Sequence, residues 1–472
     1  MSGPPSAIQR DQPGGTVEDV LQQAIYATGA IIPSNYGDLH KIGWTRSSRT
    51  DKGVHALANV VAMKLECHPS SFTADPEGSQ LASSINQHLP AEVRVLSVQR
   101  VNNGFNARGF CNNRTYHYYL PTTLLGLALD GSVEDEARMR LLRECCSLYQ
   151  GNHPFHNYTK RRLYRTPESP STAGSKHDDL SGMHHSEEQD QSSAAADQRE
   201  QGATDSSGIG AKPQQGDDLL DWDIVEDPGE DIAAHSAVHS STSIETSPAA
   251  AASAAESGMW TRPRPLQYRW LDNMEPHDRL APAHYRFIKA ISVDDPTPLT
   301  PQGASAVRVS ITGSSFMLHQ IRHMVGAAAA VARGNLPLEY VSASLCAPSR
   351  AVLPLAPAEV LVLASNSFQP FPSHGKDRLG PIQSLSGAEL QLRSQGKAAR
   401  DDFAQKVLHP AIEKLFDHEV WAQWDNDLKL TCWHDAELQV FTEKAGRWQK
   451  QRAVLSEEKQ DRLRAKTQDS GE

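Results

Sequence analysis

Apolar residues in the first third of the chain recur at spacings that distinguish helices from strands. Thr16 and Asp19 form a capping-box pattern ahead of an apolar stripe, which predicts a helix over residues 17–30. Ser132 and Asp135 predict a second long helix in the same way. The remaining elements are a short helix over 80–88 and strands over 57–66, 93–101 and 115–120.

The same kind of pattern returns near residue 283. Alternation predicts strands over 285–293 and 307–311, and in the first of these we expect Phe287 and Ile288 to point to opposite faces, with Phe287 on the side of Tyr285 and Ile291. A helix begins within 313–326, and 356–364 is a last strand. The alternation of strands and helices predicts an α+β fold.

Between these two blocks the composition changes sharply. Residues 166–258 are rich in Ser, Ala, Asp, Glu and Gln, with Trp222 as their only aromatic residue. So little apolar surface does not offset the entropy of ordering, which predicts a disordered insertion. Its acidic runs fit a solvated loop, and a role in competing with RNA or recruiting a partner is the alternative.

The charge of the chain is unevenly distributed. The insertion has 19 Asp and Glu against 3 Lys and Arg, a net of −16, so that the total of −11 leaves +5 for the remaining residues. The remainder is therefore mildly basic, which suits a phosphate-binding groove.

Length and composition bound the class of protein. The 472 residues are 38% hydrophobic, enough for a sizeable core with appendages, and no apolar run approaches membrane-spanning length. The start, Met1 to Gly15, has no apolar segment typical of a signal peptide, so we expect a soluble intracellular protein. The six cysteines lack metal-like spacing, which predicts reduced, mostly buried thiols and no metal site.

The C-terminal part, from about residue 369, is rich in Gln, Arg, Lys and Glu. Apolar patches at 407–416 and 421–433 interrupt it and predict helices that pack loosely on the body. We therefore expect a helical, charged extension over 369–472.

One polar loop carries the candidate chemistry. Asp51 is the carboxylate in a run that also contains Arg46, Arg49 and Lys52, and Gly53 allows a sharp turn just before the predicted strand. A catalytic carboxylate held before a strand explains this pattern. A surface turn aspartate paired with a neighbouring arginine explains it equally well.

The run Arg49-Thr-Asp-Lys-Gly-Val-His-Ala56 resembles the catalytic loop of the TruA family of tRNA pseudouridine synthases, which implies that Asp51 is the essential catalytic residue. The Arg-x-Tyr-x-Tyr pattern from Arg114 resembles a second family segment and implies an active-site role for Tyr116. The run Phe316 to Gly326 resembles a third, in which Arg322 would face the active site.

This resemblance implies a fold of two RRM-like halves that form one antiparallel sheet with a central cleft. Residues 1–104 would form the first half and residues 105–165 with 259–368 the second. It also implies a strand before the first helix, where this chain begins Met1-Ser-Gly-Pro-Pro, so we expect that strand to be missing.

The implied reaction converts specific uridines in tRNA to pseudouridine without a cofactor. We expect Arg49, Lys52 and Arg114 to bind the RNA substrate and Arg322 to form an ion pair with Asp51. Partners would be tRNA and other structured RNA, with no membrane. The nucleus is the expected compartment, with mitochondrion, plastid and cytoplasm as alternatives.

Two other function classes fit the residues. One is a catalytically inactive RNA-binding protein of the same fold. The other is a glycosidase-like hydrolase, which would normally need a second acidic residue, and none occurs in the three motifs.

Overall fold

The computed structural model describes residues 15–68, 71–75, 77–101, 103–159, 262–369 and 390–469, which belong to one compact unit. The acidic segment predicted to be disordered, residues 166–258, lies outside the described residues. Among the residues that are described, no helix is long and apolar enough to cross a membrane.

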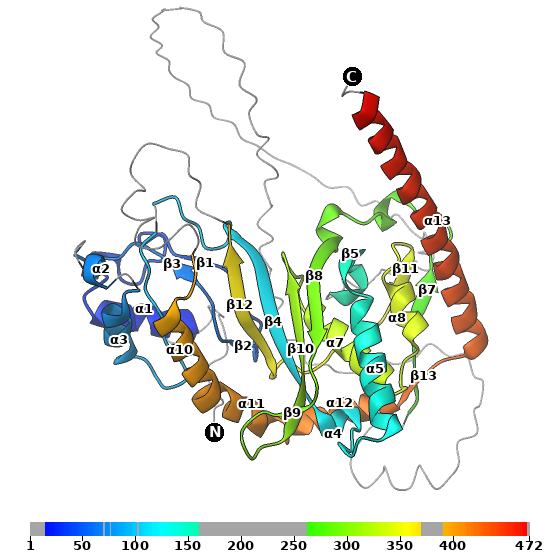
Figure 1. Ribbon diagram of the computed structural model, residues 1–472, viewed down its shortest axis with the longest axis horizontal. Coiled ribbons are helices and arrows are strands. Elements are labelled where there is room, and N and C mark those ends of the chain that lie inside the picture. Colours follow the sequence, from blue (N-terminus) through cyan, green and yellow to red (C-terminus); the bar gives the residue numbers. More distant parts are fainter. Residues whose placement is uncertain are drawn as a thin grey trace, which may run out of the picture. The chain divides into compact units, whose positions relative to one another are not determined.

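A seven-stranded sheet forms the centre of this described part (Figure 1). Its order is β2 (His55–Ala56), β12 (Leu361–Phe368), β4 (Cys111–Pro121), β10 (Ser305–Gly313), β8 (Tyr285–Val293) and β5 (Gly151–Pro154), and β9 (Thr297–Pro298) pairs with β10. Together with the helices this confirms an α+β fold. The prediction of an entirely antiparallel sheet is wrong, because β2 pairs with β12 in parallel.

Two groups of helices pack against this sheet. On one side lie α5 (Val133–Ser147), α7 (Gln320–Ala332) and α8 (Leu338–Ser344), and α5 packs on both α7 and β8. The Tyr118 hydroxyl donates to the Pro357 carbonyl, whereas the ring of the next residue, Tyr119, contacts His409 of α11 (His409–Leu415). Because neighbouring strand residues point to opposite faces, α11 covers the other side of β4.

The C-terminal helices are α10 (Ser394–Phe403), α11, α12 (Glu419–Lys429) and α13 (Asp435–Asp469), with a π-helical turn at Ala404–Leu408. Ile412, Trp424 and Phe441 are buried in the same core as the sheet. The prediction of loose packing is therefore wrong. An apolar patch in the sequence does not reveal which other element its side chains pack against.

The N-terminal part has a smaller core of its own. It comprises α1 (Val17–Ala27), α3 (Ser79–Asn86) and a two-stranded sheet of β1 (Thr45–Arg46) and β3 (Val61–Ala62). The predicted capping box is confirmed, since Asp19 N donates to Thr16 Oγ1 at 3.1 Å and Thr16 N donates to Asp19 Oδ2 at 3.2 Å.

Two strands predicted in this part do not form as expected. Residues 57–66 contain only β3, and residues 93–101 make no ladder. In the latter, Val95 exchanges hydrogen bonds with the Asn86 side chain, and Val98 N donates to the Glu77 carbonyl. A cavity of about 1140 Å³ lies against both segments. A segment with a strand pattern forms a strand only where a neighbouring strand pairs with it. Here the backbone groups of Val95 and Val98 bond to a side chain and to a loop carbonyl instead.

Phe287 and Ile288 of β8 point to opposite faces, as expected. Ile288 is fully buried, whereas Phe287 is 51% exposed. Both residues are apolar, so the alternation could not decide which of them faces the core.

The remaining elements are short. They are α2 (Ser71–Ala74), α4 (Thr122–Leu125), β6 (Arg264–Pro265), β7 (Tyr268–Trp270), β11 (Ser349–Ala351), β13 (Thr431–Cys432), and 3-10 turns at Pro33–Asn35, His156–Tyr158, Pro276–Asp278 and Pro282–His284. All six cysteines carry free thiols, and four of them are buried, as predicted.

Candidate active site

Asp51 lies in a tight turn between β1 and β2. Val54 N donates to the Asp51 carbonyl at 3.0 Å, and Gly53 has a φ of +85°, which confirms the predicted turn. Directly after the turn, Ala56 pairs with Leu363 on β12, and Leu363 pairs with Tyr116 on β4. The turn therefore connects to the central sheet two strands away from Tyr116.

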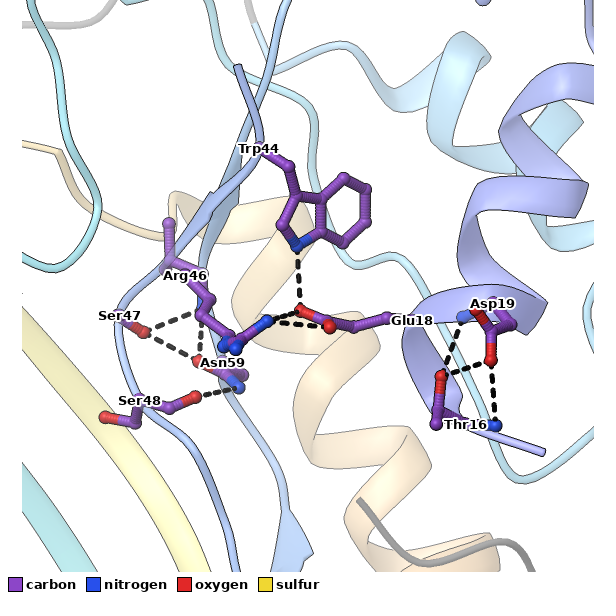
Figure 2. Close-up of polar contacts among 9 residues, drawn as sticks. Thr16, Glu18, Asp19, Trp44, Arg46, Ser47, Ser48 and Asn59 are labelled. Carbon is purple, nitrogen blue, oxygen red and sulfur yellow. Dashed lines mark hydrogen bonds and ion pairs between the residues drawn. The ribbon is translucent and has the colours of Figure 1, made fainter. Parts of the chain in front are cut away.

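The residues before Asp51 are held by Asn59. Ser47 Oγ donates to Asn59 Oδ1 at 2.7 Å, and Asn59 Nδ2 donates to the Ser48 carbonyl at 3.1 Å (Figure 2). Ser47 and Ser48 are both buried. The chain thus enters the Asp51 turn from a fixed position.

Arg46, one of the basic residues in the Asp51 run, pairs with a carboxylate of α1. Its guanidinium pairs with Glu18 of α1 at 2.6 Å, and Trp44 Nε1 donates to the same carboxylate at 2.8 Å (Figure 2). Arg46 pairs with Glu18 because α1 packs beside the strand that carries Arg46. Arg46 therefore ties α1 to the strand that leads into the Asp51 turn.

His319 is the residue that approaches Asp51. Its Nε2 lies 4.0 Å from Asp51 Oδ2, and the two side chains are 24% and 36% exposed. His319 precedes α7 with a φ of +64°, a conformation uncommon for residues other than glycine. We did not predict this residue. It lies three positions before Arg322 in the same motif, which was the available signal.

Arg322 lies in the first turn of α7. Its Nε donates to the Ala356 carbonyl at 2.6 Å. Burial lowers the pKa of its guanidinium, and the negative charges of Glu359 and Asp51 oppose this shift. Within the residues that the structure describes, no ion pair of 4.0 Å or less joins Arg322 to Asp51, so the predicted direct pair is wrong. The two charges nevertheless act within one site.

Tyr116 is buried on β4. Its ring meets Phe316 edge to face, with the centroids 5.3 Å apart. Burial raises the pKa of the phenol to about 12, the positive charge of Arg114 and a hydrogen bond with Ser48 lower it, and the charge of Asp51 raises it. The hydroxyl is therefore protonated at neutral pH.

The three residues predicted to bind RNA differ in their surroundings. Arg49 and Lys52 are exposed, and neither forms a hydrogen bond or ion pair with another residue in the described part of the chain. The Arg114 guanidinium instead donates to protein oxygens, among them the Ser47 carbonyl at 2.8 Å and the Ser314 carbonyl at 2.6 Å. Contacts of all three with RNA stay predictions.

Glu359 is a second carboxylate near the site, and no motif had indicated it. Its charge acts on Arg322 and on His55, and one of its carboxylate oxygens is buried without a hydrogen-bond partner. It lies just before β12, so that only the pairing of β12 with β2 brings it near the Asp51 turn. In the described residues, no cluster of His, Cys, Asp or Glu is arranged to hold a metal ion.

Parts of the chain are similar to known proteins. Residues 278–369, which include Arg322 and Glu359, match the family described as tRNA pseudouridine synthase. The tRNA pseudouridine synthase 1 of Eremothecium gossypii is 29% identical over 366 residues, which are 77% of this chain and 60% of that protein.

Two further relatives carry similar names. The tRNA pseudouridine synthase 1 of Saccharomyces cerevisiae is 29% identical over 370 residues, which are 77% of this chain and 58% of that protein. The human pseudouridylate synthase 1 homolog is 36% identical over 163 residues, which are 33% of this chain and 35% of that protein.

The chain spans 60% and 58% of the lengths of the two fungal relatives. Of the three motifs, the family match includes the one that contains Arg322. This chain is similar to tRNA pseudouridine synthases over most of its length, and its residues 278–369 match the family of that description.

Proposed function

We propose that this protein converts uridines in tRNA to pseudouridine. The observation that carries the proposal is the row of strands β2, β12 and β4, which links the turn of Asp51 to the strand of Tyr116. The tRNA substrate is taken from the names of the relatives.

The reaction breaks the N-glycosidic bond at N1, rotates the uracil and joins C5 to the ribose; C5 loses its proton and N1 gains one. Asp51, at 36% side-chain exposure, is accessible to a nucleotide. Its carboxylate could begin the reaction by attack on the base, by attack on the sugar or by removal of a ribose proton. Each route uses a carboxylate held in position, which the Gly53 turn and the Asn59 contacts supply.

Tyr116 and Arg322 would act around this carboxylate. With a pKa of about 12, the Tyr116 phenol is suited to stack on the base and to donate a hydrogen bond. It is poorly suited to act as a phenolate base at neutral pH. Arg322 supplies positive charge to a site that also contains Asp51 and Glu359.

The finer features of the protein belong to the same proposal. We infer that the parts on either side of residue 104 are RRM-like halves, and that RNA binds between them with the exposed Arg49 and Lys52 as phosphate or base contacts. The domain boundaries, other structured RNA as a partner and a nuclear location are expected from the family resemblance. Imaging of a tagged protein tests the location.

A single experiment tests the function. Purified protein is incubated with unmodified tRNA transcripts, and pseudouridine is mapped at each position. We expect conversion at specific uridines by the native protein and none by Asp51→Asn, with tRNA affinity within a few-fold, since one carboxylate contributes little to phosphate binding. Binding of tRNA without conversion by the native protein would support an inactive RNA-binding protein instead.

A further inference from the structure

Arg114 connects three separate segments of the chain. From β4, its Nε donates to Ser48 Oγ at 3.0 Å, and its NH2 donates to the Ser47 carbonyl at 2.8 Å. Its NH1 donates to the Ser314 carbonyl at 2.6 Å. Residues 47 and 314 are far apart in sequence, and one guanidinium bridges them.

Each of the three segments carries one of the predicted catalytic residues. Ser48 lies three residues before Asp51, and Arg114 lies two residues before Tyr116 on the same strand. Ser314 lies eight residues before Arg322, at the approach to α7. A shift of this guanidinium would change the relative positions of all three.

We propose that Arg114 is a positioning residue that holds the Asp51 turn, the Tyr116 strand and the approach to α7 in register. This inference rests on the proposed function, because it assigns Arg114 a role in that reaction. It also replaces direct RNA binding as the main role of Arg114.

The chemistry of the contacts requires arginine. The guanidinium is planar and presents five N–H donors in a fixed fork, so it can serve acceptors on two sides at once. An ammonium group on the shorter, more flexible lysine chain could reach one of these acceptors but not the Ser47 and Ser314 carbonyls together in the same geometry. Since its nitrogens already serve protein oxygens, little donor capacity is left for a phosphate.

The test compares Arg114→Met and Arg114→Lys with Arg108→Gln as a control. Arg108 is an exposed arginine on the loop before β4, and its side chain forms no hydrogen bond or ion pair in the described part of the chain. We expect Arg114→Met to lower kcat roughly 10²-fold, the loss typical of a misplaced catalytic group, with tRNA affinity within a few-fold. Arg114→Lys should recover part of kcat, and Arg108→Gln should keep native kcat.

The salt dependence of tRNA binding separates the two roles. If Arg114 contacted a phosphate, Arg114→Met would weaken tRNA binding and reduce the slope of log affinity against log salt by about one. Arg114→Lys would largely restore both. We expect instead an unchanged slope in both Arg114 variants. A loss confined to affinity, with native kcat, would overturn the proposal, as would native kcat and affinity together.

Hydrogen exchange tests the contacts without any reaction. In Arg114→Met without RNA, backbone amides of residues 47–51 and 314–319 should exchange faster, while those of β8 keep native rates. Unchanged exchange in both segments would overturn the proposal, and so would an equal rise everywhere, which indicates a general loss of stability. Should Arg114→Met fail to fold, Arg114→Lys carries the same comparison. If the native protein shows no turnover, only the proposed function is refuted. The exchange result still decides whether Arg114 joins the segments.

Discussion

His319 Nε2 lies 4.0 Å from Asp51 Oδ2, and His319 reaches that place in a left-handed backbone conformation with a φ of +64°. The strain of holding a non-glycine residue in such a conformation is of order 1–3 kcal/mol, and such residues concentrate at functional sites. The imidazole is also near His323, whose pKa burial lowers to about 4 with a further lowering from His319. The approach to α7 therefore combines backbone strain with contact to the candidate catalytic carboxylate.

Substitution of His319 separates these two features. Asn tolerates the left-handed conformation better than most residues, and Gly adopts it freely, so His319→Asn and His319→Gly should keep or raise the melting temperature. Both remove the imidazole beside Asp51, and we expect kcat for pseudouridine formation to fall at least tenfold. Single-turnover assays and thermal unfolding measure the two effects. Native kcat in His319→Asn would show that the imidazole does not assist Asp51.

Arg322 is predicted to act on the reaction more than on RNA affinity. Arg322→Met removes the cation near Asp51 and Glu359 and leaves the Ala356 carbonyl without its 2.6 Å donor. Turnover should fall by orders of magnitude, while Arg322→Lys retains the charge and recovers a part. Comparison of kcat with the dissociation constant for tRNA checks this. A change in the dissociation constant alone would mean that Arg322 is an RNA contact.

Gly326 is predicted to be required for the position of α7. A Cβ atom there would lie 2.5 Å from the Pro354 carbonyl oxygen, so Gly326→Ala must move the helix or the segment that accepts from Arg322. We expect a loss of about 1–3 kcal/mol in the free energy of unfolding and reduced turnover.

A helical glycine elsewhere supplies the control for Gly326. A Cβ atom at Gly446 in α13 would have nothing within 4 Å, so Gly446→Ala should stabilise the protein by about 0.5–1 kcal/mol. Urea unfolding measures both variants. Equal effects of the two substitutions would show that the close approach of α7 to the Pro354 carbonyl does not exclude a side chain at position 326.

The half-buried His117 predicts a pH dependence of stability. Burial lowers its pKa to about 4, Arg308 lowers it further and Asp294 opposes this, with His409 and Arg400 also acting on it. Because this pKa is below the ordinary 6.5, the unfolded chain binds the proton first as pH falls. The stability contributed by neutral His117 is complete above pH 6.5 and is lost progressively down to about pH 4.

His117→Gln tests this linkage. In that pH range the variant should show a smaller slope of unfolding free energy against pH, by up to one proton or ~1.4 kcal/mol per pH unit. His323 titrates in the same direction and should keep a residual slope. Urea unfolding at several pH values measures the difference. Identical slopes in both proteins would mean that His117 binds its proton equally in both states.

Interactions between residues close in sequence could be predicted from the sequence alone. The Thr16 capping box, the Gly53 turn and the limits of β8 at residues 285–293 all formed as expected. Each depends on a few neighbouring residues or on a repeated spacing, so the information lies within a short window. The motif resemblance indicated Asp51, Tyr116 and Arg322 in the same way, because each lies within a short run of residues.

The tertiary structure alone decided which distant groups meet. Arg46 pairs with Glu18, Arg114 bridges Ser47 and Ser314, and β2 joins β12 in parallel. Residues 93–101 had a strand pattern, but no neighbouring strand pairs with them. A charge or a backbone group can be satisfied by many partners, and the free energies of these choices differ little until packing brings one of them within reach.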